Sequence, residues 1–311
     1  MALLRLIPDN TKFNFVGIKN ATFIIAFFVF CISIFGVFNK GLNFGIDFQG
    51  GYIFEVKTKN PINLDETRSL FSKANLGDVS IQQFGEDNEL LIRVEKNEDL
   101  SQEKVIEKVK SLFSKDTDYR RIETVGPKVG EELIENATKA LIFSLIAMLL
   151  YVAVRFEWQF SLCATVALFH DCAAIFILYS FFPFEFNETS IIAILITVGY
   201  SINDTIVIFD RIRENMHHFK KMDLSELINK SINETLSRTI LTAGTTLIAL
   251  VCLYLFGGKV IAAFSFPIII GILAGTFSSI CLAAPMLLSL NIKRPSIDDD
   301  DNENPNIEKY G

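Results

Sequence analysis

Six long apolar runs constrain this chain more than any other feature of its sequence. Each is close to the 20 or so residues that a helix needs to cross a hydrocarbon core of about 30 Å. The predicted spans cover about residues 21–38, 136–154, 158–184, 189–209, 239–256 and 260–292. Hydrophobic residues make up 50% of the 311 positions, and the mean hydropathy is +0.36. The sequence therefore predicts a polytopic α-helical membrane protein with six transmembrane helices.

The distribution of lysine and arginine predicts how these spans are oriented. Basic residues gather in the short loops on one side of the predicted membrane, whereas the short loops on the other side hold only Lys259. Because basic loops stay in the cytoplasm, both termini are expected there, and the long segment 39–135 is expected in the periplasm. The run at 21–38 is longer than the apolar part of a signal peptide and lacks a following cleavage site, so it is expected to remain as an anchor.

Three cytoplasmic segments complete the predicted organisation around the five-helix transmembrane domain at 136–292. Residues 1–20 form an N-terminal segment, and residues 293–311 form an acidic tail. Residues 211–237 contain a stretch with apolar side chains at helical spacing, which predicts an amphipathic segment lying along the membrane surface. These apolar side chains are Leu224, Leu227, Ile228, Ile232 and Leu236.

The segment between the first two spans has a readable order of elements. Alternating and apolar runs predict strands at 52–57, 79–84, 89–95 and 119–125, and helical spacing predicts helices at 64–74 and 101–114. The order βαββαβ is typical of a ferredoxin-like α+β domain, in which two helices cover one face of a four-stranded sheet. Taken alone, this fold predicts no function.

Two glycine-rich stretches flank this domain and are candidate hinges, because glycine admits backbone angles that other residues avoid. Pro127 in the second stretch also favours the start of a helix. Ordinary tight turns are the alternative interpretation. The candidate hinge residues are Gly45, Gly50 and Gly51 on entry and Gly126, Pro127 and Gly130 on exit.

Composition excludes several classes of function. The formal net charge of -7 provides no basic surface for nucleic acid. The five cysteines are all in apolar stretches and show no metal-binding or redox spacing, so no metal or other cofactor is expected. The chain has no Walker-type phosphate loop, and neither ATP hydrolysis nor another enzyme activity is predicted.

Charged residues inside the spans predict the functional site, because each one costs about 3 kcal/mol or more in a membrane. Asp204 lies about 9 Å inside the cytoplasmic end of its span, and Arg238 begins the fifth span. For Arg238 the alternative is an anchor that extends to the membrane surface. Supporting polar side chains are Thr197, Ser201 and Asn203 near Asp204, and Thr242 and Thr245 near Arg238.

A second polar group lies in the third span. Asp171 is the deepest acid of the predicted spans, and the adjacent His170 titrates near neutral pH in an ordinary environment. Their side chains point about 100° apart on a helix. The pair is therefore either part of a proton path or a structural hydrogen-bonding cluster. In the sixth span, Gly271, Gly275 and Ser279 form a row of small residues that predicts close helix packing.

Five stretches of sequence together resemble the SecF family of protein-export membrane proteins. They are FGIDFQGG at 44–51, GPKVG at 126–130, FHD at 169–171, GYSINDTIVIFDRIRE at 199–214 and SRTILTAGTT at 237–246. The resemblance spans about residues 10–292, and the fourth stretch is the most specific. This family forms one half of SecDF, a member of the resistance-nodulation-division superfamily in the bacterial inner membrane.

This resemblance implies a subunit that uses the proton-motive force to assist preprotein translocation through the SecYEG channel. It implies SecD and YajC as further partners, beside preprotein chains and the lipid bilayer, with protons as the coupling ion. Asp204 and Arg238 match the proton-relay positions of the family, whereas His170 and Asp171 are supporting candidates. The alternatives are a proton-coupled exporter of small molecules or lipids from the same superfamily, or a translocon scaffold that transports nothing.

Overall fold

The computed structural model describes residues 11–292, except 46, 47, 49, 75, 78, 84, 85, 87, 96–99, 115, 116, 183 and 291. Its contacts divide the chain into two compact units. The helical unit takes the chain up to residue 41, residues 143–184 and the chain from residue 192. The α/β unit takes residues 42–142 and 185–191.

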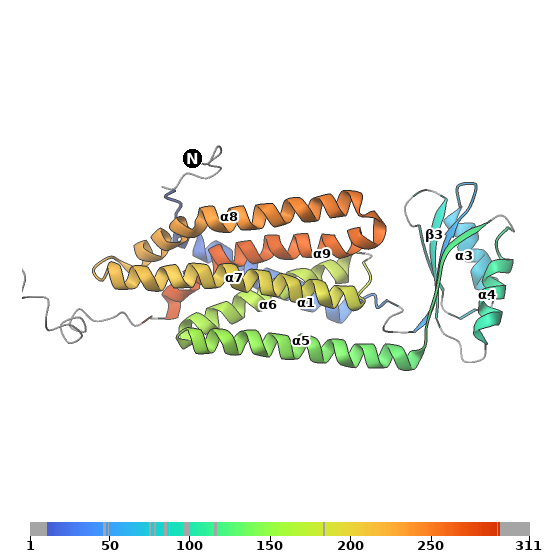
Figure 1. The fold of residues 1–311 in the computed structure, drawn as a ribbon, viewed down its shortest axis with the longest axis horizontal. Helices are drawn as coiled ribbons and strands as arrows, with labels where there is room; N and C mark the ends of the chain where they lie inside the picture. The colour runs from blue at the N-terminus through green and yellow to red at the C-terminus, as the bar shows by residue number, and fades with distance from the viewer. Residues whose placement is uncertain are drawn as a thin grey trace, which may run out of the picture. The chain divides into compact units, whose positions relative to one another are not determined.

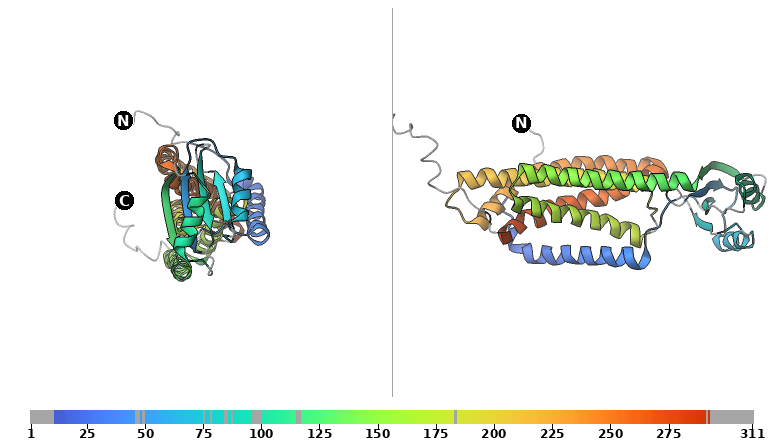
Figure 2. Two further views of the ribbon diagram at one scale, coloured as in Figure 1. Left: turned by 90° about the vertical axis from the view of Figure 1, so that its right-hand side faces the viewer. Right: turned by 90° about the horizontal axis from the view of Figure 1, so that it is seen from below.

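Six helices in the described part of the chain are long and apolar enough to cross a membrane, as predicted. Within the helical unit, α8 packs against α9, and α6 packs against both α1 and α9. Figure 1 and Figure 2 show α8 and α9 side by side along their length. The helices are α1 (Lys19–Lys40), α5 (Pro127–Arg155), α6 (Trp158–Phe181), α7 (Glu188–His218), α8 (Leu224–Phe256) and α9 (Gly258–Phe277).

The sixth span changes its helix type near its end. Pro267 lies inside α9 without ending it. After α9 the backbone continues as a π-helical turn, η2 (Ser278–Ala283), then as the short α10 (Ala284–Met286) and the 3-10 turn η3 (Leu287–Leu290). A π-helical turn is wider than an α-helical one and frequently occurs at functional sites. The over-long run at 260–292 is therefore several helical segments in succession.

The segment 211–237 differs from the prediction of a separate surface helix. Its first part continues α7 as far as His218, and its last part is the beginning of α8. Asp223 caps α8, since its side chain accepts a hydrogen bond from the Ser225 N–H at 2.9 Å. Leu227, Ile228 and Ile232 are 0% exposed. The apolar face of this segment therefore packs inside the helical unit.

The α/β unit has the predicted βαββαβ order. Its elements are β1 (Gly51–Lys57), α3 (Leu64–Lys73), β2 (Val79–Gln83), β3 (Glu89–Val94), α4 (Gln102–Ser111) and β4 (Asp118–Val125). The strands form one antiparallel sheet in the order β2-β3-β1-β4, which is the ferredoxin-like arrangement. Both helices lie on one face of the sheet (Figure 1), and Phe54, Phe71 and Val109 meet in the core.

The connections of this unit bear on the hinge candidates. Gly50 and Gly51 have φ of 72° and 131°, which only glycine adopts readily. Gly45 donates its N–H to Phe186 O at 2.9 Å, and this bond holds the entry stretch to the loop before α7. At the exit, α5 begins at Pro127. Gly130 lies in the first turn of that helix, so the loop part of the exit ends at Gly126.

Candidate functional site

A buried carboxylate on α6 is the centre of the polar cluster in the helical unit. Asp171 is 0% exposed. Its Oδ2 accepts hydrogen bonds from Ser201 on α7 at 2.5 Å and from Ser278 of η2 at 2.9 Å, and its Oδ1 lies 3.1 Å from His170 Nδ1. One acid therefore joins three segments that are far apart in the sequence, through polar contacts at both of its oxygens.

Close packing between α7 and α9 brings the hydroxyl groups to this acid. An added Cβ at Gly271 would lie 2.3 Å from Thr197 Cγ2, and one at Gly275 would lie 2.8 Å from Ser201 Cβ. One turn further, Ser279 bonds to the Thr205 hydroxyl at 2.8 Å. The predicted close packing of the small-residue row is thereby confirmed. Its partners on α7 are Thr197, Ser201 and Thr205.

Asp204 lies on α7, three residues after Ser201. It is 3% exposed, and its Oδ2 has no hydrogen-bond partner among the described residues. Burying a carboxylate without partners is expensive, so such a group is held by a nearby cation or takes up a proton. The neighbouring Asn203 points away and is exposed. Of the polar residues predicted around Asp204, Thr197 and Ser201 are buried with it.

Arg238 on α8 is the cation that acts on the charge of Asp204. It is exposed on the surface of the isolated helical unit, and the two side chains form no direct ion pair in the described part of the chain. Thr242 donates to the Arg238 and Thr239 carbonyls at 3.1 and 2.9 Å. Thr245 donates to the Thr242 carbonyl at 3.0 Å. Both threonines therefore use their hydroxyls within α8.

Sequence reasoning missed two members of the cluster, Ser278 and Thr205. Ser278 adjoins the predicted small-residue row, and Thr205 follows Asp204 directly. The only signal was a hydroxyl inside an apolar run, which is common wherever a serine or threonine bonds to its own helix. Their roles depend on the π-helical turn and on the pairing of α7 with η2, and neither is visible in a hydropathy pattern.

Fold and site together define a polytopic membrane protein with buried carboxyl groups between its helices. A bundle of membrane-spanning helices encloses two carboxyl groups and a chain of hydroxyls, and a ferredoxin-like unit is inserted between its first two spans. Among the described residues, no group of three or more metal-ligating side chains is present. Carboxyl groups and hydroxyls buried between apolar helices can hold a charge or exchange a proton.

Comparison with known proteins gives the family. The family description "Protein export membrane protein SecD/SecF, C-terminal" matches residues 104–293, and "SecD/SecF GG Motif" matches residues 35–62. The chain is 42% identical over 288 residues to "Protein translocase subunit SecF" of Rickettsia bellii, covering 91% of this chain and 95% of that protein. The same subunit of Rickettsia conorii is also 42% identical, with 91% and 94% covered. The chain belongs to the SecF family of protein translocase subunits.

Solved structures give the same result. The crystal structure of SecDF, a translocon-associated membrane protein from Thermus, aligns with 92% of this chain at 35% identity and a TM-score of 0.83. SecDF in a super-membrane-facing form aligns with 90% at the same identity and a TM-score of 0.68. The chain spans 39% of the length of each of these SecDF chains.

Proposed function

We propose that this chain is the SecF-type half of a SecDF complex that uses the proton-motive force to assist preprotein translocation through the SecYEG channel. In this proposal SecD and YajC are its partners in the bacterial inner membrane, both termini are cytoplasmic, and the α/β unit is periplasmic, where it meets emerging chains. The chain acts as a proton-driven accessory without enzyme activity or a cofactor.

The observation that carries this proposal is the burial of Asp204, which is 3% exposed with one oxygen unbonded. That oxygen has no hydrogen-bond donor among the described residues to hold a negative charge on it. An acid held beside Arg238 without a direct pair is suited to gaining and losing a proton. One proton crossing 100 mV supplies about 2.3 kcal/mol, which biases a two-state equilibrium more than tenfold.

The polar cluster gives the proton a route through hydroxyls. Ser201 lies one turn from Asp204 on α7 and donates to Asp171, whose other oxygen is beside His170. His170 Nε2 is buried and has no partner among the described residues, so it is available to exchange a proton with water that enters the bundle. In this route Asp171 and His170 pass the proton, and Asp204 and Arg238 control its release.

The test is reconstitution of the chain with SecD and SecYEG in vesicles, with preprotein translocation and proton flux measured together. Asp204→Asn is expected to assemble normally and to abolish both proton flux and its stimulation of translocation. Asp210→Asn is the matched control, because Asp210 lies on the same helix and pairs with Arg155 at a partly exposed position.

Three outcomes separate the alternatives. Unchanged translocation in the assembled Asp204→Asn complex refutes the proton-driven role and favours a scaffold. Proton flux coupled to release of a small molecule or lipid without preprotein favours an exporter. Loss of both activities in Asp204→Asn but not in Asp210→Asn supports the proposal.

A further inference from the structure

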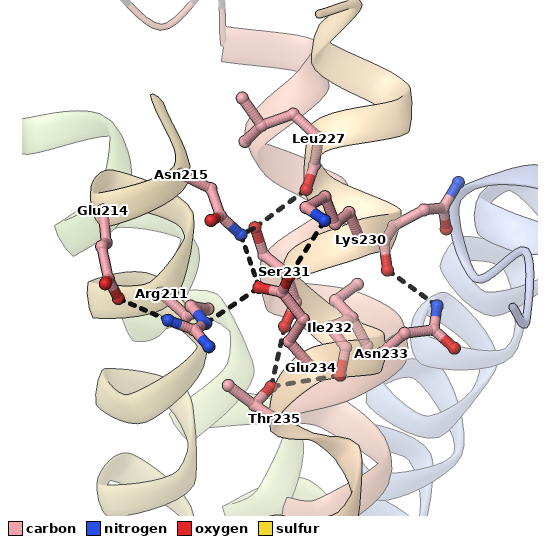
Figure 3. A network of polar contacts seen from close by, with 11 residues as sticks. Arg211, Glu214, Asn215, Leu227, Lys230, Ser231, Ile232, Asn233, Glu234 and Thr235 are labelled. Carbon is pink, nitrogen blue, oxygen red and sulfur yellow. Dashed lines mark hydrogen bonds and ion pairs between the residues drawn. The ribbon is translucent and has the colours of Figure 1, made fainter. Parts of the chain in front are cut away.

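A network of charged and polar side chains joins α7 to α8 beyond the site. Glu234 Oε2 accepts from Arg211 Nε at 2.9 Å and from Asn215 Nδ2 at 2.8 Å, and Glu234 Oε1 pairs with Lys230 at 3.1 Å. Asn215 also donates to Ser231 at 2.9 Å. Figure 3 shows Arg211 and Asn215 reaching from one helix to Glu234 and Ser231 on the other. Among the described residues, the hydrogen-bond and ion-pair partners of Glu234 therefore do not include Asp204, Asp171 or Arg238.

This network continues the two helix faces that carry Asp204 and Arg238. Arg238 follows Glu234 by four residues, one turn along α8, and Arg211 follows Asp204 by seven residues, two turns along α7. The two pairs of charges, one turn apart along α8 and two turns apart along α7, have opposite signs on each helix. Asp204 on α7 lies near the cation Arg238 on α8, whereas Arg211 on α7 pairs with the anion Glu234 on α8.

Arg238 therefore has one acid a turn before it on its own helix, Glu234, and acts electrostatically on a second acid, Asp204 of α7. Glutamate four residues before arginine is the favourable arrangement for an ion pair within a helix. Glu234 does not pair with Arg238 here, because Arg211, Lys230 and Asn215 occupy its oxygens. Other charged groups lie around the Arg211–Glu234 pair. Glu214 also pairs with Arg211. Lys12 and Glu226 line the same hollow as Lys230 and Glu234.

We infer that Glu234 is the alternative partner of Arg238, and that Arg211, by competing for Glu234, controls how strongly the charge of Arg238 acts on Asp204. This inference rests on the proposed proton-driven function. Arg211 and Glu234 are positioning residues in it, because neither contacts the transported proton.

The proton balance requires only one titrating group. Asp204 takes a proton from the route on its far side and becomes neutral, so Arg238 loses its counter-charge. Arg238 stays protonated and turns toward Glu234, displacing Arg211. When Arg211 regains Glu234, the charge of Arg238 again acts on Asp204 and favours the carboxylate, and the proton leaves toward the cytoplasm. One proton enters and one leaves, and no other bond changes.

The test is a pH titration of the Asp204 carboxyl group in the complete complex in vesicles. Infrared difference spectra report the protonated carboxyl, and the band lost in Asp204→Asn assigns it. Arg211→Gln frees Glu234 for Arg238 and is expected to raise the pH midpoint by about half a unit, roughly a threefold change in proton affinity. Glu234→Gln removes the alternative partner and is expected to lower the midpoint. Arg213→Gln on the same helix is the control, with no shift expected.

The double variant distinguishes competition from a direct effect of charge. If Arg211 acts only by occupying the Glu234 carboxylate, the Arg211→Gln/Glu234→Gln variant has the same pH midpoint as Glu234→Gln alone, because without that carboxylate Arg211 has no effect on Arg238. Additive shifts, or no shift in Arg211→Gln, overturn the inference. Because the titration needs no translocation, these results are distinct from the failure of the proposed function, which appears as unchanged translocation in Asp204→Asn.

Discussion

The contact of α9 with α7 can be tested through Gly271, where a single methyl group has a calculable effect. In Gly271→Ala the new Cβ would lie 2.3 Å from Cγ2 and 2.4 Å from Oγ1 of Thr197. Carbon atoms pack favourably at about 3.5–4.0 Å, so the two helices must separate by about 1 Å. Overpacking of a buried contact costs about 1–3 kcal/mol. Because alanine favours a helix over glycine by up to about 1 kcal/mol, the net loss is expected to be about 1–2 kcal/mol.

A separation of this size would also disturb the polar cluster. Thr205 on α7 bonds to Ser279 at 2.8 Å, and Ser279 lies in the turn that directly follows α9. Lengthening this bond by about 1 Å removes it, because hydrogen bonds do not persist at such distances. Gly271→Ala is therefore expected to reduce proton-dependent activity as well as stability.

The assay is thermal unfolding of the purified chain in detergent, with Gly244→Ala as the matched control. An added Cβ at Gly244 on α8 meets nothing within 4 Å, so this substitution is expected to leave the unfolding temperature unchanged or raise it. Gly271→Ala is expected to lower it by several degrees, and Thr197→Ala in the same chain is expected to restore part of the loss. Equal stability of the two alanine variants would refute the packing argument.

Three further predictions concern other parts of the chain. Asn63→Ala removes the side-chain cap of α3 and is expected to cost about 1 kcal/mol in denaturant unfolding, whereas Ser101→Ala, whose hydroxyl makes no cap bond, costs nothing measurable. Ser201→Ala takes a donor from the buried α6 carboxylate and is expected to lower stability by about 1–3 kcal/mol; Ser265→Ala, which loses a bond only to its own helix, is expected to cost less in the same thermal assay. Burial raises the pKa of Tyr119, so the unfolded chain releases this proton first and stability falls as the pH rises above about 10; Tyr119→Phe should flatten that fall in an alkaline unfolding titration.

The six spans and the βαββαβ unit could be predicted because each depends on a local periodic pattern. Strands β1 and β3 alternate or run apolar over their length, and the apolar runs of α1 and α6 have the length of a membrane span. The continuity of α8 could not be predicted for a related reason. The charged residues Lys230, Glu234 and Arg238 separate the amphipathic segment from the fifth apolar run in the sequence, whereas one helix runs from Leu224 to Phe256. Hydropathy locates the membrane boundary but does not tell whether the helix ends there.

The polar cluster was only partly predictable because its members come from separate segments. Asp204 and Asp171 were identifiable one by one, since a charge in an apolar run is costly wherever it lies. The bond from Ser278 to Asp171 depends on a π-helical turn, and the pair of Arg211 with Glu234 depends on the register between two helices. Such registers are set by side-chain packing between helices, and no single helix pattern contains that information.

The register of the sheet has a mechanical consequence. Gly51, where the chain enters the α/β unit, is the direct partner of Val125, where the chain leaves it. A force that pulls these two points apart opens β1 and β4 from one end, breaking hydrogen bonds one after another, which requires little force. A force that pulls both points together loads no bond between these strands. The α/β unit can therefore transmit a force that acts on Gly51 and Val125 in the same direction, but it resists a force that separates them only weakly.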